Sequence, residues 1–279
     1  MADPNPERRR PGRGWAVPRG HGESLDHPDQ WFVWLTSSSV AGQKEGLWHG
    51  GSWPDNGAVA NEPERGLRTA RERVERLSSA IAANRGFGPW DELWAAKLEV
   101  LVAEREVAEA AGDEFAVEID VGLTWSTGAP LPQLLANGSA AYLLFLLADV
   151  DPHWDGTEVR VVDPAAAETE RLGVVAFHQV HSVKFGGPND EALKGHPLSG
   201  RGLRPYRAHQ VVNSRWIADA ERINSVHRYH RGGWHERLNH YVFCFHDETF
   251  ECIAEGFSTQ RRTGSLRDVL ASTVSRLWV

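Results

Sequence analysis

The sequence has little of what stabilises a secreted domain or anchors a chain in a membrane. It contains two cysteines in 279 residues, too few for a disulfide framework, so we expect reduced thiols and a cytoplasmic protein. The charged N-terminal segment 1–14 is not followed by an apolar stretch, so no export signal is expected. The most apolar run, AAYLLFLLADV at 140–150, is too short to cross a bilayer, and we expect no membrane association.

Positive charge is also scarce, because 30 lysines and arginines stand against 38 aspartates and glutamates, for a net charge of -8. A nucleic-acid partner needs a basic face and is therefore not expected. The remaining composition, 41% hydrophobic and 24% charged, is typical of a soluble globular protein. Tryptophan is the exception, with 12 residues against one methionine. Each buried indole supplies apolar area and needs a partner for its N–H.

The first 112 residues predict a tail, a tryptophan-rich loop and a pair of helices. Residues 1–30 are rich in Pro, Arg and Gly, so we expect a disordered tail. The tryptophans of the following Gly/Pro-rich loop either hold it to the body or form flat platforms for a ligand; they are Trp31, Trp34, Trp48 and Trp53. Helical periodicity over 66–84 and about 90–111 predicts an antiparallel hairpin. Self-association of this hairpin into a homo-oligomer is an alternative role for its apolar faces.

From residue 114 the hydrophobic period changes from 3.6 to 2, which indicates strands. EFAVEIDVGLTWS at 114–126 alternates, and further strands are expected at 157–162, 171–186 and 207–214, with a hairpin over 239–257. Segment 140–150 fits either a helix or a buried strand, whereas 214–224 and 265–277 predict helices. The fold class is therefore α+β. We expect a mainly antiparallel, curled or barrel-like sheet with short helices in a core domain at 113–262, followed by a C-terminal helix within 263–279.

The hairpin over 239–257 contains both cysteines, and its register decides whether they meet. A two-residue turn at 247–248 would place Cys244 and Cys252 on opposite faces, whereas a three-residue loop at 247–249 would make them neighbours able to form a disulfide. We expect them to be reduced.

Residues 174–257 hold nine of the 13 histidines and are the expected location of any functional site. His227, His230, His235 and His240 lie within fourteen residues. Three imidazoles suffice for a catalytic metal centre, so these four predict a divalent transition metal, zinc or iron, as cofactor. The alternative is that a loop rich in Arg and His forms an ordinary polar surface.

Acid–base chemistry is the second hypothesis for this region. His246 lies beside Asp247, and a carboxylate near an imidazole suits a general base or acid, provided the turn folds back to pair them. His181 is a third catalytic candidate, although strand alternation places it with the core residues Val175 and Phe177. His178 and His181 could bind one ion only if the strand is broken between them, because residues three apart point to opposite faces.

The loop FGGPNDEALKGHPLSGRG at 185–202 supplies the candidate ligand-binding residues Asn189, Asp190, His196 and Arg201. Asp190 has an alternative role, since an acid in the first turn of a short helix offsets the helix dipole. We therefore expect an enzyme acting on a small molecule in a His/carboxylate-rich pocket between the sheet and loops 186–206 and 224–240, with or without a metal. The alternative is a non-catalytic protein that binds a small molecule or a partner.

Overall fold

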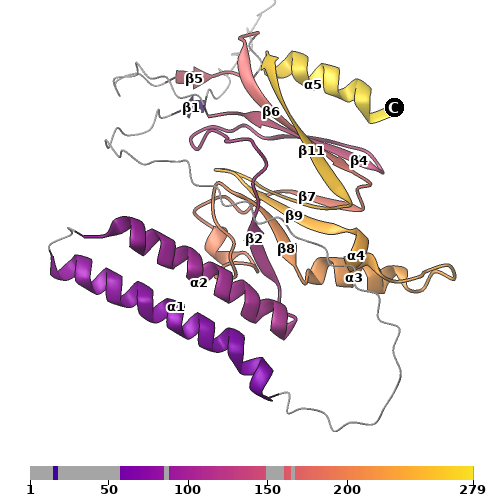
Figure 1. The fold of residues 1–279 in the computed structure, drawn as a ribbon. Helices are drawn as coiled ribbons and strands as arrows, with labels where there is room; N and C mark the ends of the chain where they lie inside the picture. Colours follow the sequence, from indigo (N-terminus) through magenta and orange to yellow (C-terminus); the bar gives the residue numbers. More distant parts are fainter. Residues whose placement is uncertain (1–14, 18–56, 85–87, 149–159, 165–166, 279) are drawn as a thin grey trace, which may run out of the picture.

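The computed structural model describes residues 15–17, 57–84, 88–148, 160–164 and 167–278. The fold class is α+β, as expected from the sequence: a helical hairpin precedes two antiparallel sheets that carry short helices (Figure 1). The sheets pack face to face and do not close into a barrel. Within the described ranges, no helix is both long and apolar enough to span a membrane. The tryptophan-rich loop at 31–53 and the N-terminal tail lie outside the described residues, apart from the short strand β1 (Trp15–Val17).

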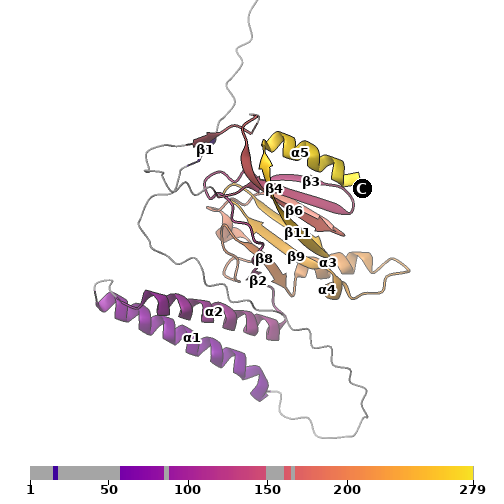
Figure 2. The same ribbon diagram turned by 45° about the horizontal axis from the view of Figure 1, so that its top comes forward.

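The helical hairpin consists of α1 (Gly57–Ala83) and α2 (Trp90–Ala111). Helix α1 begins well before the expected residue 66 and runs through Pro63, a residue that usually limits helices to its C-terminal side. Helix α2 has the expected bounds and ends at Gly112, whose left-handed backbone (φ 69°) closes the helix. In both views α2 lies between α1 and the sheets (Figures 1 and 2).

The five-stranded sheet has the order β2-β8-β9-β10-β7, with all neighbours antiparallel. Its strands are β2 (Phe115–Glu118), β8 (Ala208–Val212), β9 (Asn239–Cys244), β10 (Thr249–Ala254) and β7 (Ser182–Gly186). Strand β2 is shorter than the alternating pattern predicts. The Asp120 carboxylate accepts a hydrogen bond from the Gly122 amide (2.7 Å), and Gly122 turns the chain with a φ of 67°.

The four-stranded sheet has the order β11-β6-β4-β3. Its strands are β11 (Gly256–Gly264), β6 (Glu170–His178), β4 (Ala140–Leu146) and β3 (Gln133–Ala136), while β1 (Trp15–Val17) pairs separately with β5 (Arg160–Val162). The ambiguous segment at 140–150 is therefore a strand. The side chain of Asn137 accepts hydrogen bonds from the amides of Ser139 and Ala140, both at 2.8 Å, and so makes the turn from β3 into β4.

The single strand expected over 171–186 is wrong: the chain forms β6 and β7, which belong to different sheets. The break lies at Gln179, which has a left-handed φ of 50°. The strand is thus interrupted between His178 and His181, but the interruption separates the two histidines. His178 contacts Ser258 of the four-stranded sheet (3.2 Å), and His181 leads into the other sheet.

The main core lies between the two sheets and is dominated by aromatic rings. Phe177 of β6 meets Phe243 of β9 edge to face at a centroid distance of 5.8 Å, and Trp125 meets Phe145 of β4 at 5.4 Å. On its outer face, the four-stranded sheet is covered by α5 (Leu266–Val274), which continues into a short 3-10 helix, η2 (Ser275–Trp278).

The outer face of the five-stranded sheet is covered by segment 187–206 and by two short helices. Leu193 and Leu198 of this segment, which includes the 3-10 helix η1 (Leu193–Gly195), pack on Val242 and Cys244. Helices α3 (Arg215–Asn224) and α4 (Trp234–Arg237) cover the neighbouring part of the same face around Ile253. The covered polar side chains of this face are therefore shielded from water.

The β9–β10 hairpin turns at residues 246–247, so both registers considered from the sequence are wrong. Cys244 lies opposite Thr249 and Cys252 opposite Tyr241. Cys244 belongs to the outer cluster and Cys252 to the main core, and both are buried free thiols. Burial raises the pKa of each thiol to about 12, so neither is a ready nucleophile.

Candidate functional site

Two groups of polar side chains lie on the outer face of the five-stranded sheet, on either side of the apolar contacts made by segment 187–206. The turn cluster consists of Asp190, Tyr206 and His246. The strand cluster consists of Lys184, His196, Ser214, His240 and Glu251. We compare them as candidate active sites by access, hydrogen bonding and charge.

The turn cluster is built by the tight β9–β10 turn, because that turn positions His246 against segment 187–206. The carbonyl of His246 accepts a hydrogen bond from the Asp190 amide (2.9 Å), and the hydroxyl of Thr249 donates to the carbonyl of Pro188 (2.8 Å). These two bonds fix the start of the segment on the turn, so that Asp190 comes to His246 from a position 56 residues earlier.

Within the described residues, the imidazole of His246 is hydrogen-bonded at one nitrogen only. Its Nδ1 lies 3.1 Å from the Asp190 Oδ2 and 3.1 Å from the Tyr206 hydroxyl, and that hydroxyl donates to Asp190. An ionised carboxylate can only accept, so we assign the proton to Nδ1 from this network, which leaves Nε2 with a free lone pair. The side chain of His246 is 40% exposed, whereas that of Asp190 is 18% exposed.

Electrostatics favour a charged Asp190 and a neutral Tyr206. Burial opposes the ionisation of Asp190, but the hydrogen bonds from Tyr206 and His246 outweigh it and lower its pKa. Burial, the bond to Asp190 and the nearby Asp247 raise the pKa of Tyr206 to about 12, so its phenol keeps the proton that it donates. Tyr206 also has a left-handed backbone with a φ of 59°, a strained conformation for a large side chain.

The sequence indicated His246 as a catalytic residue paired with Asp247, but the structure pairs it with Asp190. The Asp247 carboxylate lies 4.0 Å from His246 Nε2, too far for a hydrogen bond, because both residues are central in a two-residue turn. Asp190, expected to bind a ligand, is the carboxylate that orients His246 instead. Tyr206 was missed altogether. Its position in RGLRPY gives no periodic or motif signal, and only the folded segment brings it to the turn.

The strand cluster has the order of groups found in Ser–His–acid hydrolases. The Ser214 hydroxyl donates to His240 Nδ1 (2.9 Å), and His240 Nε2 donates to the Glu251 Oε2 (3.0 Å). Lys184 donates to the other oxygen of Glu251 at 3.3 Å, and His196 Nε2 lies 3.8 Å from it. Although burial opposes ionisation, His196, His240 and Lys184 hold the pKa of Glu251 far below its usual range.

A structural role accounts for every group of the strand cluster. Ser214 is 1% exposed and His240 3% exposed, so a substrate cannot reach either in this conformation. The Ser214 oxygen also accepts the Ile217 amide (3.3 Å) as the N-cap of α3. Both nitrogens of His240 are satisfied, and Trp216 lies against its ring at a centroid distance of 5.1 Å. The cluster joins α3 to the sheet through Ser214 and His240, which are buried and whose side-chain polar atoms are all paired.

The four histidines expected to bind a metal do not converge. His240 is enclosed in the strand cluster, His230 Nε2 lies 3.6 Å from Glu221, and His227 and His235 are exposed. In the parts of the chain that the structure describes, no group of three His, Cys, Asp or Glu side chains is arranged to hold a metal ion. The geometry therefore gives no support to the zinc or iron hypothesis at these residues.

Among the described residues, the remaining expected site residues form no hydrogen bond or ion pair with His246. His181 is exposed, with its ring 4.7 Å from that of Trp234, and it does not face the core as alternation suggested. Asn189 accepts the amide of Ala192 and so shapes its own loop, and His196 belongs to the strand cluster. Arg201 lies 3.9 Å from Asp113 near β2.

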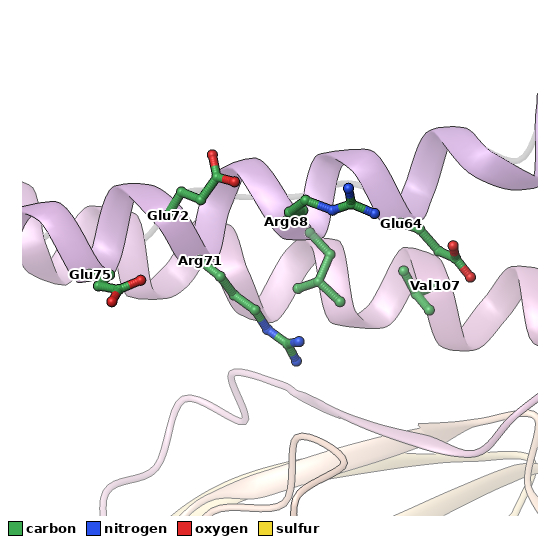
Figure 3. Close-up of a pocket in the computed structure, with 7 residues that line it drawn as sticks. Glu64, Arg68, Arg71, Glu72, Glu75 and Val107 are labelled. Carbon is green, nitrogen blue, oxygen red and sulfur yellow. The ribbon is translucent and has the colours of Figure 1, made fainter.

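A hollow along the helical hairpin offers no comparable chemistry (Figure 3). It is lined by Glu64, Leu67, Arg68, Arg71, Glu72, Glu75 and Val107. The Arg71 guanidinium is paired with Glu104 at 2.9 Å, and the lining has no histidine, serine or cysteine. The lining carries charges of both signs, as expected of a solvated helical surface.

Of the two clusters, the turn cluster is therefore the better candidate site, since its imidazole is oriented by a carboxylate and is also exposed to solvent. No protein family, no curated protein and no solved structure was found to match this chain.

Proposed function

We propose that the protein is an enzyme that acts on a small molecule, with His246 of the turn cluster as its general base. One observation carries the proposal: Nδ1 of His246 is anchored to the half-buried carboxylate of Asp190, while the His246 side chain as a whole is 40% exposed. In this arrangement Nε2 accepts a proton from water or from the substrate, and Asp190 stabilises the imidazolium that forms. Tyr206 keeps Asp190 in place through its hydroxyl.

The reaction class that fits is proton abstraction, either from a substrate or from an attacking water. The nearest hydroxyl, that of Tyr206, is bonded to Asp190 and keeps its proton, so it is not a nucleophile. The two buried cysteines are equally unsuitable. Hydrolysis by a water molecule that His246 activates therefore needs the fewest catalytic groups beyond those of the turn cluster. Asp190 acts through His246 and is a positioning residue.

The first test measures the tautomer of His246 by long-range ¹H–¹⁵N NMR of the full chain. We expect Nδ1–H in the wild type, and loss of that preference in Asp190→Asn, because the amide can donate to Nδ1 as well as accept. A wild-type Nε2–H tautomer would overturn the proposal, since Nε2 would then carry the proton and would have no lone pair with which to act as a base.

The second test is hydrolysis of a panel of small nitrophenyl esters. His246→Gln should lower kcat/KM by about 10²–10⁴, the usual contribution of a general base. Asp190→Asn should lower kcat/KM by at least about tenfold with the pH profile displaced. His181→Gln is the matched control, because His181 is an exposed histidine directly before β7 and outside the cluster, and it should leave the rate unchanged. Equal rates for His246→Gln and the parent would refute the assignment.

A further inference from the structure

Helix α2 carries two apolar seams, each made of residues spaced alternately three and four positions apart. The first seam contains all the buried residues of the helix and consists of Leu93, Ala96, Val100, Ala103 and Val107. Arginines of α1 pair with Glu99 (2.6 Å) and Glu104 (2.9 Å) on either side of this seam, so it faces α1. The second seam consists of Trp94, Leu98 and Leu101, with Val102 beside it. At about 100° per residue it lies on the opposite side of the helix.

The second seam is open to solvent. Trp94 is 49%, Leu98 58% and Val102 48% exposed. Together with Leu101, these side chains expose roughly 300 Å² of apolar surface, and a contiguous patch of this size commonly marks an interaction site. Lys97 Nζ lies 4.4 Å from the centre of the Trp94 ring, but a long flexible side chain can move aside when a partner covers the indole.

The residues along the second seam are arranged symmetrically about Leu98, which suits a second copy of the same helix. Asp91 lies seven residues before Leu98 and Arg105 seven residues after it, and both continue the three-and-four spacing. In an antiparallel pair with Leu98 on the two-fold axis, Asp91 of each copy faces Arg105 of the other. Trp94 then faces Val102. A parallel pair would instead place like charges opposite each other.

From this self-complementary seam we propose that two copies of the chain associate through α2 as an antiparallel pair, which gives a layer of four helices with the two α2 helices at its centre. The end of the hairpin at which α1 and α2 join projects beyond the sheets in both views (Figures 1 and 2), and Trp94 lies about one turn from it. The Arg105 side chain is 40% exposed and bonds Glu109 through Nε (2.7 Å), so its terminal nitrogens can reach Asp91.

The area of the seam predicts a weak dimer. Two such faces with their polar rims would bury roughly 1,000 Å² in total, which is at the lower end of specific interfaces. We therefore expect a dissociation constant of about 1–100 µM.

Sedimentation velocity of the full chain over about 1–300 µM tests this association, and we expect a monomer–dimer equilibrium. Leu98→Glu should weaken the dimer at least about 100-fold, because the two-fold axis brings the two new carboxylates together. Ile223→Glu is the matched control, since Ile223 is a 64% exposed aliphatic residue of α3 outside the seam, and it should leave the equilibrium unchanged. Both are exposed helix positions, so circular dichroism should show folded variants.

Charge reversal tests the antiparallel arrangement itself. Asp91→Lys and Arg105→Glu should each weaken the dimer by about tenfold or more, because symmetry repeats each change and turns attraction into repulsion. The variant with both reversals should recover to within about threefold of the parent affinity. Asp91 and Arg105 are about 21 Å apart within one helix, so they can compensate only across the interface.

A monomer at every concentration would overturn the proposal. So would a dimer that Leu98→Glu leaves intact, or a pair of charge reversals that does not recover. If the parent is monomeric and Leu98→Glu is markedly less stable, another segment of the same chain covers the seam, and the dimer is equally refuted.

Discussion

Replacing Ser214 by alanine tests whether the strand cluster is structural. The change removes the N-cap of α3, which costs about 1 kcal/mol. It also leaves the buried Nδ1 of His240 without a donor, which costs a further ~1–3 kcal/mol. Ser214 is 1% exposed, so water cannot replace the lost bond without disturbing the packing of Trp216. The expected loss in the free energy of unfolding is therefore about 2–4 kcal/mol.

The chain offers a matched control for this experiment. Ser265 is the N-cap of α5, is likewise buried, and accepts the Asp268 amide at 3.1 Å, but it contacts no histidine. Ser265→Ala should therefore cost only the cap, about 1 kcal/mol. Urea unfolding followed by circular dichroism gives both values, and their difference isolates the bond between Ser214 and His240.

Two results would refute the structural interpretation of the strand cluster. The first is a Ser214→Ala variant no less stable than Ser265→Ala, which would mean that His240 Nδ1 finds another partner or is hydrated. The second is rapid labelling of Ser214 in the native protein by a fluorophosphonate, in which the serine oxygen displaces fluoride from phosphorus and His240 takes the proton. Labelling would show that the cluster opens and that Ser214 acts as a nucleophile.

Three shorter predictions test the charge and packing of the same body. The pKa of Glu251 is lower in the folded than in the unfolded protein, so ionised Glu251 stabilises the fold. This stabilisation is fully present above the unfolded pKa of about 4.3 and is lost progressively as the pH falls below that value. The free energy of unfolding of Glu251→Gln, measured from about pH 7 to pH 3, should therefore depend less on pH than that of the parent. Cys244 and Cys252 should resist iodoacetamide in the native protein and react at once in urea, as followed by mass spectrometry; native alkylation would contradict their burial. Gly173→Ala should destabilise the protein by about 1–3 kcal/mol, since the added Cβ would lie 2.6 Å from a buried phenylalanine ring of β4. Gly66→Ala, on the open face of α1, should instead raise the stability of the protein slightly. Thermal unfolding of both variants measures the two effects.

Much of the fold could be predicted because the spacing of apolar residues along a short segment indicates which of its side chains are buried. The helix at 90–111, the strand at 208–212 and helix α3 follow from patterns of neighbouring residues. The predictions failed where a single backbone conformation overrides the pattern. Gln179 breaks an apolar run that reads as one continuous strand, because its left-handed backbone sends the chain from one sheet to the other.

The candidate site was only partly predictable, because its geometry depends on contacts between distant segments. His246 was found from its neighbour Asp247, yet the carboxylate that orients it is Asp190, brought there by the bond between main-chain groups of the turn and segment 187–206. His240 was grouped with three nearby histidines by sequence spacing. Its actual partners, Ser214 and Glu251, lie on another element and on the neighbouring strand.

The contrast between the two clusters explains why only one is suited to chemistry. Each contains a histidine bound to a carboxylate on the same face of one sheet, so residue type alone does not distinguish them. In the strand cluster, Lys184 neutralises Glu251 and Ser214 occupies the second nitrogen of His240, which leaves no charge or lone pair for a ligand. In the turn cluster, the His246 side chain is 40% exposed and its second nitrogen has no hydrogen bond within the described residues, where the surrounding carboxylates also lack a lysine or arginine partner. A buried histidine with every group paired stabilises the fold, whereas one paired on a single side retains the capacity to move a proton.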